Sequence, residues 1–455
     1  MTTPLVDLQQ YFQSGATQSF AFRALQLEKL KNAVLASEKA IYNALYVDLK
    51  KSEEEAWATE IGFFLNELHH TLDHLKSWMQ PSKVSTNLLN QPSDCYTIQE
   101  PLGVVCIIGP WNYPFQLLFT PLIGAIAGGN CVVLKPSEFA PATAKIMQEI
   151  ISKTFPPNYV LLVEGEGAEV LPPMLTNFRF DHIFYTGSTA VGKIIYQYAA
   201  AQLVPVTLEL GGKSPAVLTP DANYRVAARR IASTKFSNAG QMCVAPDYVL
   251  VPTAFKSILI EELIKAIQQF YGVNAATSEH YGKIINDKQW QRLTSYLTEG
   301  EIVYGGKTDR EKLFIEPTIM TNIHPDANIM KDEIFGPILP IITYQSNEEA
   351  LAVIHKNPNP LAFYVFTENK TTEDYWLTNV PSGGACVNNA TLHITNHDLP
   401  FGGRGYSGIG GYHGKSSFDT FTHKKSVLKT PTWIDPSFKY PPYKGKAWLL
   451  KRLIG

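Results

Sequence analysis

Apolar residues recur at three- and four-residue steps over about 19–79, between glutamates and lysines, which is the spacing of one buried helix face. The repeat includes Phe22, Leu25, Leu30 and Ala33. Pro81 ends this helical region, because proline has no N–H for a helical hydrogen bond. The stretch 84–99 then alternates weakly and carries an Asn-Gln-Pro-Ser turn, which predicts a hairpin outside the main sheet.

From residue 104 the pattern changes to short apolar runs that alternate with amphipathic segments. Strands are expected at 104–108, 131–134, 159–163 and 183–185, with helices at about 114–127 and 140–154. A second series begins near 211, with strands expected at 216–218, 248–251, 338–343, 363–366 and 384–387. Apolar strands separated by helices are typical of parallel sheets that are covered on both faces. The pattern therefore predicts an α/β protein with a Rossmann-like, doubly wound unit and a second α/β unit.

Composition narrows the class of protein. At 455 residues the chain is too long for one compact core. Its 39 Lys plus Arg nearly balance 41 Asp plus Glu, so no nucleic-acid partner is expected. The N-terminus is too polar for a signal peptide, and no apolar run reaches the ~20 residues that span a bilayer. The five cysteines are scattered and form no Cys-x-x-Cys pair, which disfavours a zinc site or disulfides. We therefore expect a soluble cytoplasmic protein without a metal site.

Two residues could carry covalent chemistry. Cys243 follows a run of small and polar residues, which would give a substrate close access to the sulfur, although a lone cysteine is more often a small buried hydrophobe. Glu209 lies between two leucines at the end of a strand, where burial would raise its pKa and suit a general base. The alternative for Glu209 is an edge residue that pairs with Lys213.

Loops that follow strands carry further candidates. Asn112, within Gly-Pro-Trp-Asn-Tyr-Pro, could donate its amide to an oxyanion or simply cap a helix. Lys135 and Glu138 follow a strand where nucleotides bind in parallel sheets and could hydrogen-bond a ribose, although such a segment also makes an ordinary turn. Gly187 and Ser188 open a helix whose N–H groups could meet a pyrophosphate, but they match neither common phosphate-binding motif.

Two other features have simpler interpretations. Glu67, His70 and His74 have the spacing of metal ligands on one helix face, but in polar surroundings we expect a solvated face. The basic, aromatic tail at 440–455 could touch a membrane, but we expect it to dock on its own chain or on a neighbouring subunit.

Seven motifs, in order between residues 109 and 403, make the chain resemble the aldehyde dehydrogenase superfamily. They are Gly-Pro-Trp-Asn-Tyr-Pro (109–114), Lys-Pro-Ser-Glu (135–138), Tyr-Thr-Gly-Ser-Thr (185–189), Leu-Glu-Leu-Gly-Gly-Lys-Ser-Pro (208–215), Gly-Gln-Met-Cys (240–243), Glu-Ile-Phe-Gly-Pro (333–337) and Pro-Phe-Gly-Gly (400–403). The short N-terminal region, a His-Ile-Thr-Asn-His segment and a Tyr-Pro-Pro-Tyr tail are similar to the class 3 branch. Ala190, where many members have Glu, also fits class 3, whereas Arg404 replaces a frequently small residue. The tail lacks the long apolar anchor of some class 3 relatives.

This resemblance implies NAD(P)-dependent oxidation of an aldehyde to a carboxylic acid. Cys243 would attack the aldehyde carbon as a thiolate, Asn112 and the Cys243 N–H would bind the oxyanion, and Glu209 would activate the water that hydrolyses the thioester. The implied cofactor contacts are Lys135 and Glu138 at the adenosine ribose, Gly187 and Ser188 at the pyrophosphate, and Glu333 and Phe335 at the nicotinamide. Because a carboxylate at Glu138 would repel a 2′-phosphate, we expect a preference for NAD with NADP accepted.

The motif positions also suggest substrate, domains and assembly. Trp111, Tyr113, Met242 and Phe401 are expected to line an apolar pocket for medium- or long-chain aliphatic, or aromatic, aldehydes. The resemblance implies an NAD(P)-binding domain at 1–82 and 102–210, with a return segment at about 407–423, a catalytic domain at 211–406, and an oligomerisation hairpin and tail at 83–101 and 424–455. A homodimer is therefore expected.

Three alternatives concern the fate of the acyl group. A CoA-dependent acylating dehydrogenase would have no use for Glu209 as a water-activating base. A binding protein that has lost activity need not retain Cys243, Asn112 and Glu209 together. A cofactor-free cysteine hydrolase would leave the Lys135 and Glu333 motifs without a purpose. Cysteine-dependent NADH formation without added CoA would separate the dehydrogenase from all three.

Overall fold

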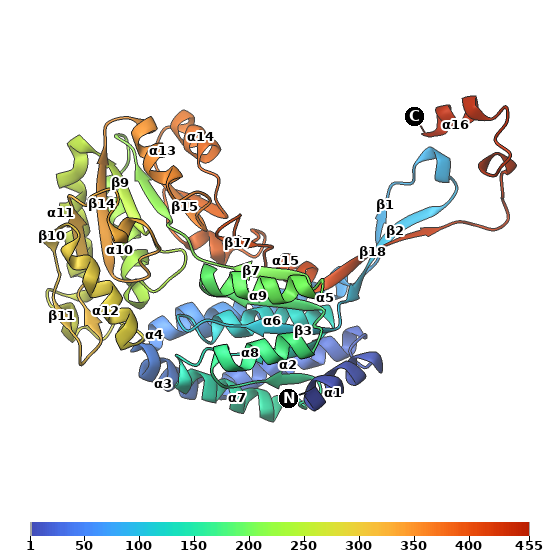
Figure 1. Cartoon of the computed structure of the whole chain (residues 1–455), viewed down its shortest axis with the longest axis horizontal. Helices are drawn as coiled ribbons and strands as arrows, with labels where there is room; N and C mark the ends of the chain where they lie inside the picture. The colour runs from blue at the N-terminus through green and yellow to red at the C-terminus, as the bar shows by residue number, and fades with distance from the viewer. Residues whose placement is uncertain (1, 455) are drawn as a thin grey trace.

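The computed structural model describes residues 2–454 (Figure 1). In it, the first series of apolar runs forms a six-stranded sheet with the strand order β17-β7-β6-β3-β4-β5. Its strands are β3 (Val104–Ile108), β4 (Cys131–Lys135), β5 (Val160–Leu162), β6 (His182–Thr186), β7 (Val206–Glu209) and β17 (Gly408–Ile409). All pairs are parallel except β17 with β7. Every residue of β3, β4 and β6 is buried, as expected for strands covered on both faces.

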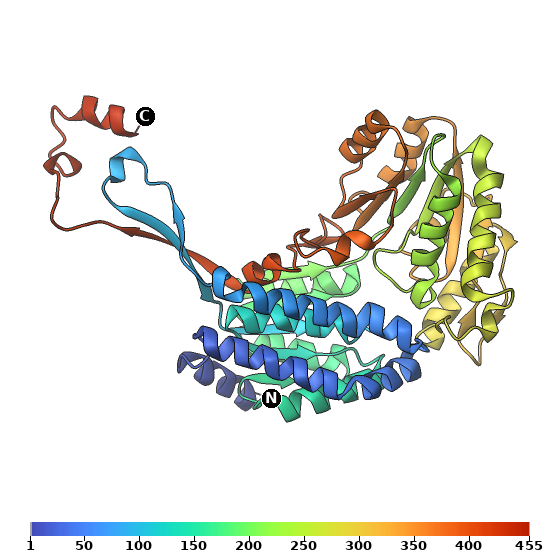
Figure 2. The ribbon, with the colours of Figure 1, turned by 180° about the vertical axis from the view of Figure 1, so that it is seen from behind.

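Helices cover the two faces of this sheet. Helices α8 (Gly167–Asn177) and α9 (Thr189–Ala201) lie in front in Figure 1, and the N-terminal helices lie in front when the molecule is seen from behind in Figure 2. Helix α6 (Gln116–Gly128) connects β3 to β4 and is buried along its whole length, and α7 (Pro141–Thr154) connects β4 to β5. The predicted helices and strands of this unit are thus confirmed, including the strand predicted to end at Glu209, which is β7.

The N-terminal region is helical from its first described residue. It comprises α1 (Thr2–Gln13), α2 (Phe20–Ala36), α3 (Glu38–Leu49), α4 (Glu53–Ala56), a π-helical turn (Trp57–Ile61) and α5 (Gly62–Trp78). Helix α1 was not predicted, because the apolar repeat becomes regular only after Ser19. The buried side of α2 is formed by Leu27, Leu30 and Val34, whereas Leu25, expected in the apolar repeat, is 53% exposed.

The second series forms a seven-stranded sheet with the order β10-β13-β14-β9-β8-β15-β16. Its strands are β8 (Pro215–Leu218), β9 (Tyr248–Pro252), β10 (Glu301–Tyr304), β13 (Thr318–Thr321), β14 (Ile338–Tyr344), β15 (Ala362–Phe366) and β16 (Gly384–Val387), and β11 (Thr308–Asp309) and β12 (Phe314–Ile315) pair separately. Its helices are α10 (Tyr224–Phe236), α11 (Lys256–Tyr271), α12 (Asp287–Ser295), α13 (Asn347–His355) and α14 (Lys370–Asn379). Only β10 is antiparallel to its neighbour, and the predicted second α/β unit is confirmed.

A three-stranded antiparallel sheet projects from the first unit as a long arm (Figures 1 and 2). It pairs β1 (Ser82–Val84) with β2 (Asp94–Pro101), as the hairpin prediction required, and β2 with β18 (Thr422–Lys429). Helix α15 (Lys415–Thr420) precedes β18, and the tail ends in α16 (Ala447–Ile454) at the tip of the arm. Within residues 2–454 no helix combines the length and the apolar character needed to cross a bilayer.

The strand order of the first sheet determines where a ligand can bind. The chain passes from β3 outward to β4 and β5, and then returns to place β6 on the other side of β3. Ligands of open α/β sheets bind at such a reversal, beyond the carboxyl ends of the strands, because the following loops diverge there. The loops that follow β3 and β6 begin at Gly109 and Gly187, which are the segments with the predicted motifs.

Candidate functional site

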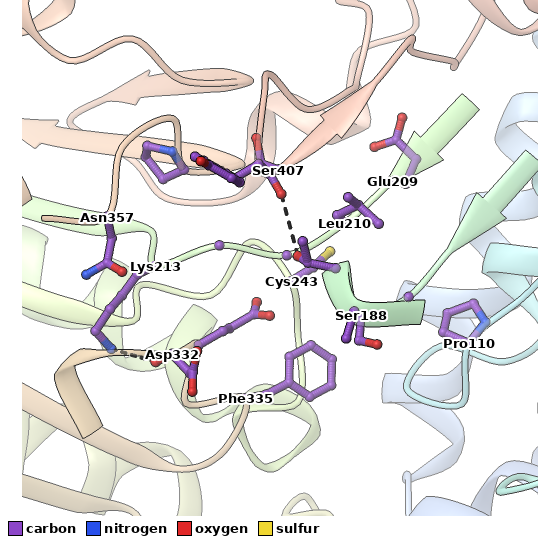
Figure 3. Close-up of a pocket in the computed structure, with 18 of the residues that line it drawn as sticks. Pro110, Ser188, Glu209, Leu210, Lys213, Cys243, Asp332, Phe335, Asn357 and Ser407 are labelled. Atoms are coloured by element: carbon purple, nitrogen blue, oxygen red, sulfur yellow. Dashed lines mark hydrogen bonds between the residues drawn. The ribbon is translucent and has the colours of Figure 1, made fainter. Parts of the chain in front are cut away.

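A cavity of about 830 Å³ lies between the two α/β units, at the reversal point of the first sheet (Figure 3). The loops after β3, β6 and β7 line one side of the cavity. The other side is lined by segments of the second unit and by the loop 237–243 that carries Cys243, here called the cysteine loop. Eight of the predicted site residues contribute to its wall. They are Trp111, Asn112, Gly187, Ser188, Glu209, Cys243, Glu333 and Phe335.

Cys243 is held by a tight loop that follows α10. Asn238 and Ala239 have φ values of 50° and 51°, the left-handed region, and Gly240 has 76°. A Cβ on Gly240 would lie 2.3 Å from the Gly336 carbonyl oxygen, so only glycine allows this close approach. The Cys243 side chain is partly exposed, and Figure 3 shows its sulfur near the centre of the site. Burial of the sulfur, together with the nearby Glu333 and Glu209 carboxyls, raises the pKa of the Cys243 thiol.

Glu209 is the last residue of β7 and is only 2% exposed. Neither of its carboxyl oxygens has a hydrogen-bond partner among the described residues. The alternative pairing with Lys213 does not occur, because the Lys213 Nζ contacts Asp247 Oδ2 at 2.6 Å and the Ile329 carbonyl oxygen at 2.6 Å. Burial raises the pKa of Glu209 well above its usual value. An unpaired, buried carboxyl that lines the same cavity as a cysteine is suited to accept a proton from water.

Asn112 lies in the loop between β3 and α6. Its side-chain amide donates to the Gln241 carbonyl oxygen at 3.0 Å, two residues before Cys243. Helix α6 begins four residues later at Gln116, and the Asn112 side chain makes no capping contact, so the cap interpretation is excluded. The two halves of a potential oxyanion site, the Asn112 amide and the cysteine loop, are therefore directly linked.

Lys135 is the last residue of β4 and Glu138 lies in the loop that follows it, both outside the cavity lining. Lys135 Nζ donates to the Pro136 carbonyl oxygen at 2.6 Å and to Glu138 Oε2 at 3.2 Å, and Glu138 Oε1 accepts from the Gly167 N–H at 3.1 Å. Partial burial opposes ionisation of Glu138, but hydrogen bonds from the backbone N–H groups of Glu138 and Gly167 and the Lys135 ammonium lower its pKa. Glu138 is therefore an ionised carboxylate near the carboxyl edge of the sheet.

The cavity wall fits a dinucleotide. Ser188 is the N-cap of α9, and its Oγ accepts from the Val191 N–H at 3.4 Å. The other N–H groups at this end of the helix can bind a pyrophosphate. On the opposite side, Glu333 Oε1 has no hydrogen-bond partner among residues 2–454. A Cβ on Gly211 would lie 2.0 Å from Glu333 Oε2, so glycine leaves room for this carboxyl. These features suit a nicotinamide dinucleotide with Glu333 at a ribose.

The predicted substrate-pocket residues are placed differently from one another. Trp111 lines the cavity and packs edge-on against Phe335, with ring centroids 5.2 Å apart. Tyr113, Met242 and Phe401 do not line this cavity. The ring of Tyr113 instead lies 3.8 Å from the Lys51 Nζ, and Phe401 stacks on His413 with centroids 5.4 Å apart.

The interpretation of Glu67, His70 and His74 as a solvated face is wrong for Glu67. This carboxyl is fully buried and accepts from the Gly414 N–H at 2.7 Å, with the His397 Nδ1 at 2.8 Å. It joins α5 to the segment that returns from the second unit, a contact between residues far apart in sequence that helical periodicity cannot reveal. No cluster of three or more potential metal ligands occurs in the described part of the chain.

Several residues of the cavity were not identified from the sequence. The second unit contributes Gln289, Arg292, Lys331, Lys356 and Asn357, and the return segment contributes Tyr406 and Ser407. They belong to no motif, so only the folded chain brings them to the site. Asn238 and Gln241 do not line the cavity but hydrogen-bond Asn112; they stand within the small, polar run before Cys243, and that run was a usable signal.

The chain is similar to known proteins over nearly its whole length. The sequence profile of the Aldehyde dehydrogenase family matches residues 8–427. A 4,4'-diaponeurosporen-aldehyde dehydrogenase of Staphylococcus aureus is 46% identical over 447 residues, which cover 98% of this chain and 97% of that protein. An aldehyde dehydrogenase of Rattus norvegicus, named dimeric and NADP-preferring, is 43% identical over 437 residues, 96% of each chain. A solved structure, the substrate-bound state of Staphylococcus aureus AldH, superposes with a TM-score of 0.97 at 45% identity and covers 100% of this chain and 99% of that one.

Proposed function

The chain belongs to the aldehyde dehydrogenase family, and we propose that Cys243, Asn112 and Glu209 are its catalytic residues. It is an NAD(P)-dependent oxidoreductase that oxidises aldehydes. One observation carries the residue assignment: a cysteine, an amide donor and an unpaired buried carboxyl line the same cavity. The first unit, with Lys135, Glu138, Gly187 and Ser188, would be the cofactor domain, and the second unit the catalytic domain.

The proposed roles follow from the chemistry of each group. The Cys243 thiol first loses its proton, and the resulting thiolate forms a bond to the aldehyde carbon while the carbonyl π pair moves to oxygen. The Asn112 amide and the Cys243 N–H donate to this oxyanion. When bound, NAD(P) supplies the hydride acceptor, and Glu333 and Phe335 would hold its nicotinamide end. Glu209 then takes a proton from water, which attacks the acyl carbon and releases the acid from Cys243. Water as the acyl acceptor distinguishes this enzyme from an acylating, CoA-dependent one.

The proposed substrates are medium- or long-chain aliphatic, or aromatic, aldehydes. Trp111 gives the cavity an apolar wall, and the relative from Staphylococcus aureus is named a 4,4'-diaponeurosporen-aldehyde dehydrogenase. We expect kcat/KM to rise about two- to fourfold per added methylene. The upper end corresponds to complete burial of a CH₂ group, which contributes ~0.8 kcal/mol. NAD(P)H formation with an aldehyde series and no CoA measures this. A charged semialdehyde that is turned over faster than octanal would contradict the proposal.

The ionised Glu138 is proposed to favour NAD over NADP. Replacing Glu138 by Gln removes the charge that repels a 2′-phosphate, so we expect the ratio of kcat/KM for NADP to that for NAD to rise about tenfold. The matched control is Glu149→Gln, an exposed acid on α7. An unchanged ratio in the Glu138 variant would remove this residue from the cofactor site.

The arm is proposed to form a homodimer interface. It carries Val84, Leu88 and Leu428, which are between 50% and 63% exposed, and Trp433, which is 77% exposed. Exposed apolar side chains and a strand edge on an extended arm are typical of a surface that a partner covers. Light scattering should therefore give twice the mass of one chain, and Leu428→Asp should lower it. Val273→Asp, at a residue 81% exposed on the second unit, should not; a monomeric wild type contradicts the proposal.

A further inference from the structure

The loop that carries Asn112 rests on a buried ion pair from the N-terminal region. Lys51 Nζ lies 2.5 Å from Glu60 Oε1, and neither side chain has exposed surface. Neither residue lies in any of the motifs that identified the family. The pair lies between the N-terminal helices and the segment 112–116, here called the catalytic loop.

The pair contacts the catalytic loop at both ends. Lys51 Nζ donates to the Asn112 carbonyl oxygen at 3.1 Å and lies 3.8 Å from the centre of the Tyr113 ring. Glu60 Oε2 accepts from the Gln116 N–H at 2.9 Å, at the start of α6. The ammonium and the carboxylate thus bracket the segment from Asn112 to Gln116 and fix its backbone.

Glu60 owes its position to an irregular helix. It lies in the π-helical turn Trp57–Ile61, which separates α4 from α5. Single π-helical turns are frequent at functional sites, because the extra residue shifts the side chains around the helix axis. A buried ion pair adds little net stability compared with apolar side chains of similar size, so stability alone does not account for it.

The same N-terminal region also holds the cysteine loop. Glu55 Oε1 accepts from the Asn238 N–H at 2.7 Å and from Ser237 Oγ at 2.9 Å. Asn238 Nδ2 in turn donates to the Asn112 carbonyl oxygen at 2.8 Å. The carbonyl of Asn112 is therefore fixed by two donors, Lys51 and Asn238, while its side-chain amide faces the cysteine loop.

We propose that Lys51 and Glu60 are positioning residues that aim the Asn112 amide at the oxyanion formed when Cys243 attacks the aldehyde. This inference rests on the proposed function, in which Asn112 is an oxyanion donor. A donor that is displaced by about 1 Å loses much of its effect, because the barrier depends steeply on alignment. The pair contacts the Asn112 backbone and acts on the reaction only through that residue.

The variant Lys51→Met/Glu60→Gln tests the proposal without leaving a lone buried charge, and its Gln can still accept from the Gln116 N–H. We expect kcat/KM for the aldehyde to fall about 10- to 100-fold, up to the ~10²–10³-fold loss of a complete oxyanion donor. Two other readouts should stay within about twofold: NADH affinity by fluorescence titration, and the rate of Cys243 alkylation by iodoacetamide. Alkylation uses the same sulfur but forms no oxyanion, so an equal loss in both reactions would overturn the proposal.

A matched control comes from the same segment. Asp48 is also buried and accepts from the Thr143 N–H at 2.8 Å, at the start of α7, away from the catalytic loop. Asp48→Asn should therefore lower thermal stability while leaving kcat/KM within about twofold. A comparable fall in kcat/KM in this control would show that any buried change in the segment impairs the enzyme, and would overturn the proposal.

A double-mutant cycle separates this inference from the function on which it rests. Asn112→Ala alone should lower kcat/KM by about 10²–10³-fold, and adding the Lys51/Glu60 changes should cost no more than about twofold. Multiplicative losses would overturn the positioning role, whereas an Asn112 variant with full activity would overturn the proposed function instead. If the double variant does not fold, Lys51→Met alone replaces it, because a buried Glu60 without its partner can take up a proton and stay neutral; the same split between aldehyde turnover and alkylation is expected.

Discussion

Replacing Cys243 by alanine should abolish aldehyde-dependent NAD(P)H formation, with kcat lowered by at least ~10⁴-fold. Loss of a nucleophile removes the covalent route itself, and in other enzymes that use one, such losses reach about 10⁶-fold. The serine variant should be almost as inactive, since an alkoxide is much harder to form than a thiolate. Coenzyme binding should persist in both variants, because no proposed cofactor contact depends on the sulfur.

The measurement is NAD(P)H formation by the wild type and the two variants, with an aldehyde and without CoA. Cys106→Ala is the matched control, since Cys106 is buried in β3 and does not line the cavity. The control should lose stability and keep its turnover per folded molecule. Residual activity above about one per cent in the Cys243 variants would exclude the thioester mechanism.

Replacing Glu209 by glutamine should stop the reaction after the first turnover. Without a general base the thioester persists, so kcat should fall by about 10²–10⁴-fold, while each active site still releases one NAD(P)H in a rapid burst. Burial raises the pKa of Glu209. In the wild type, a kcat that is limited by thioester hydrolysis should therefore be low below that raised pKa, where Glu209 is protonated. It should rise with pH as the carboxyl ionises. The glutamine variant should lose this pH-dependent limb.

Glu333→Gln is the discriminating control for this prediction. Glu333 is a second carboxyl in the same cavity, and burial raises its pKa as well. If Glu209 is the base, the Glu333 variant should hydrolyse the thioester normally and show a weaker affinity for the coenzyme. The opposite pattern, a burst followed by arrest in the Glu333 variant alone, would assign the base to Glu333.

The sequence by itself determined the family and most of the strands of the two parallel sheets. Runs such as Val104–Ile108 are short and apolar at every position, as a strand covered on both faces requires, and the structure has a strand with these bounds. Motifs were equally readable, because Cys243, Glu209 and Asn112 each stand in a short segment whose neighbours are informative. Local patterns of this kind need no knowledge of distant parts of the chain.

Only the tertiary structure decided which distant residues meet. Glu67 looked solvent-exposed in its helix, yet it binds Gly414 and His397, which lie more than three hundred residues later. Lys51 and Glu60 carried no motif, and their role became visible only when both were found beneath Asn112. Burial of a charge is a property of the surroundings that the whole fold creates, because a partner that compensates the charge can come from any part of the chain. Periodicity and local motifs therefore predicted the elements and the candidate chemistry, and the packing of the two units decided the geometry in which that chemistry can occur.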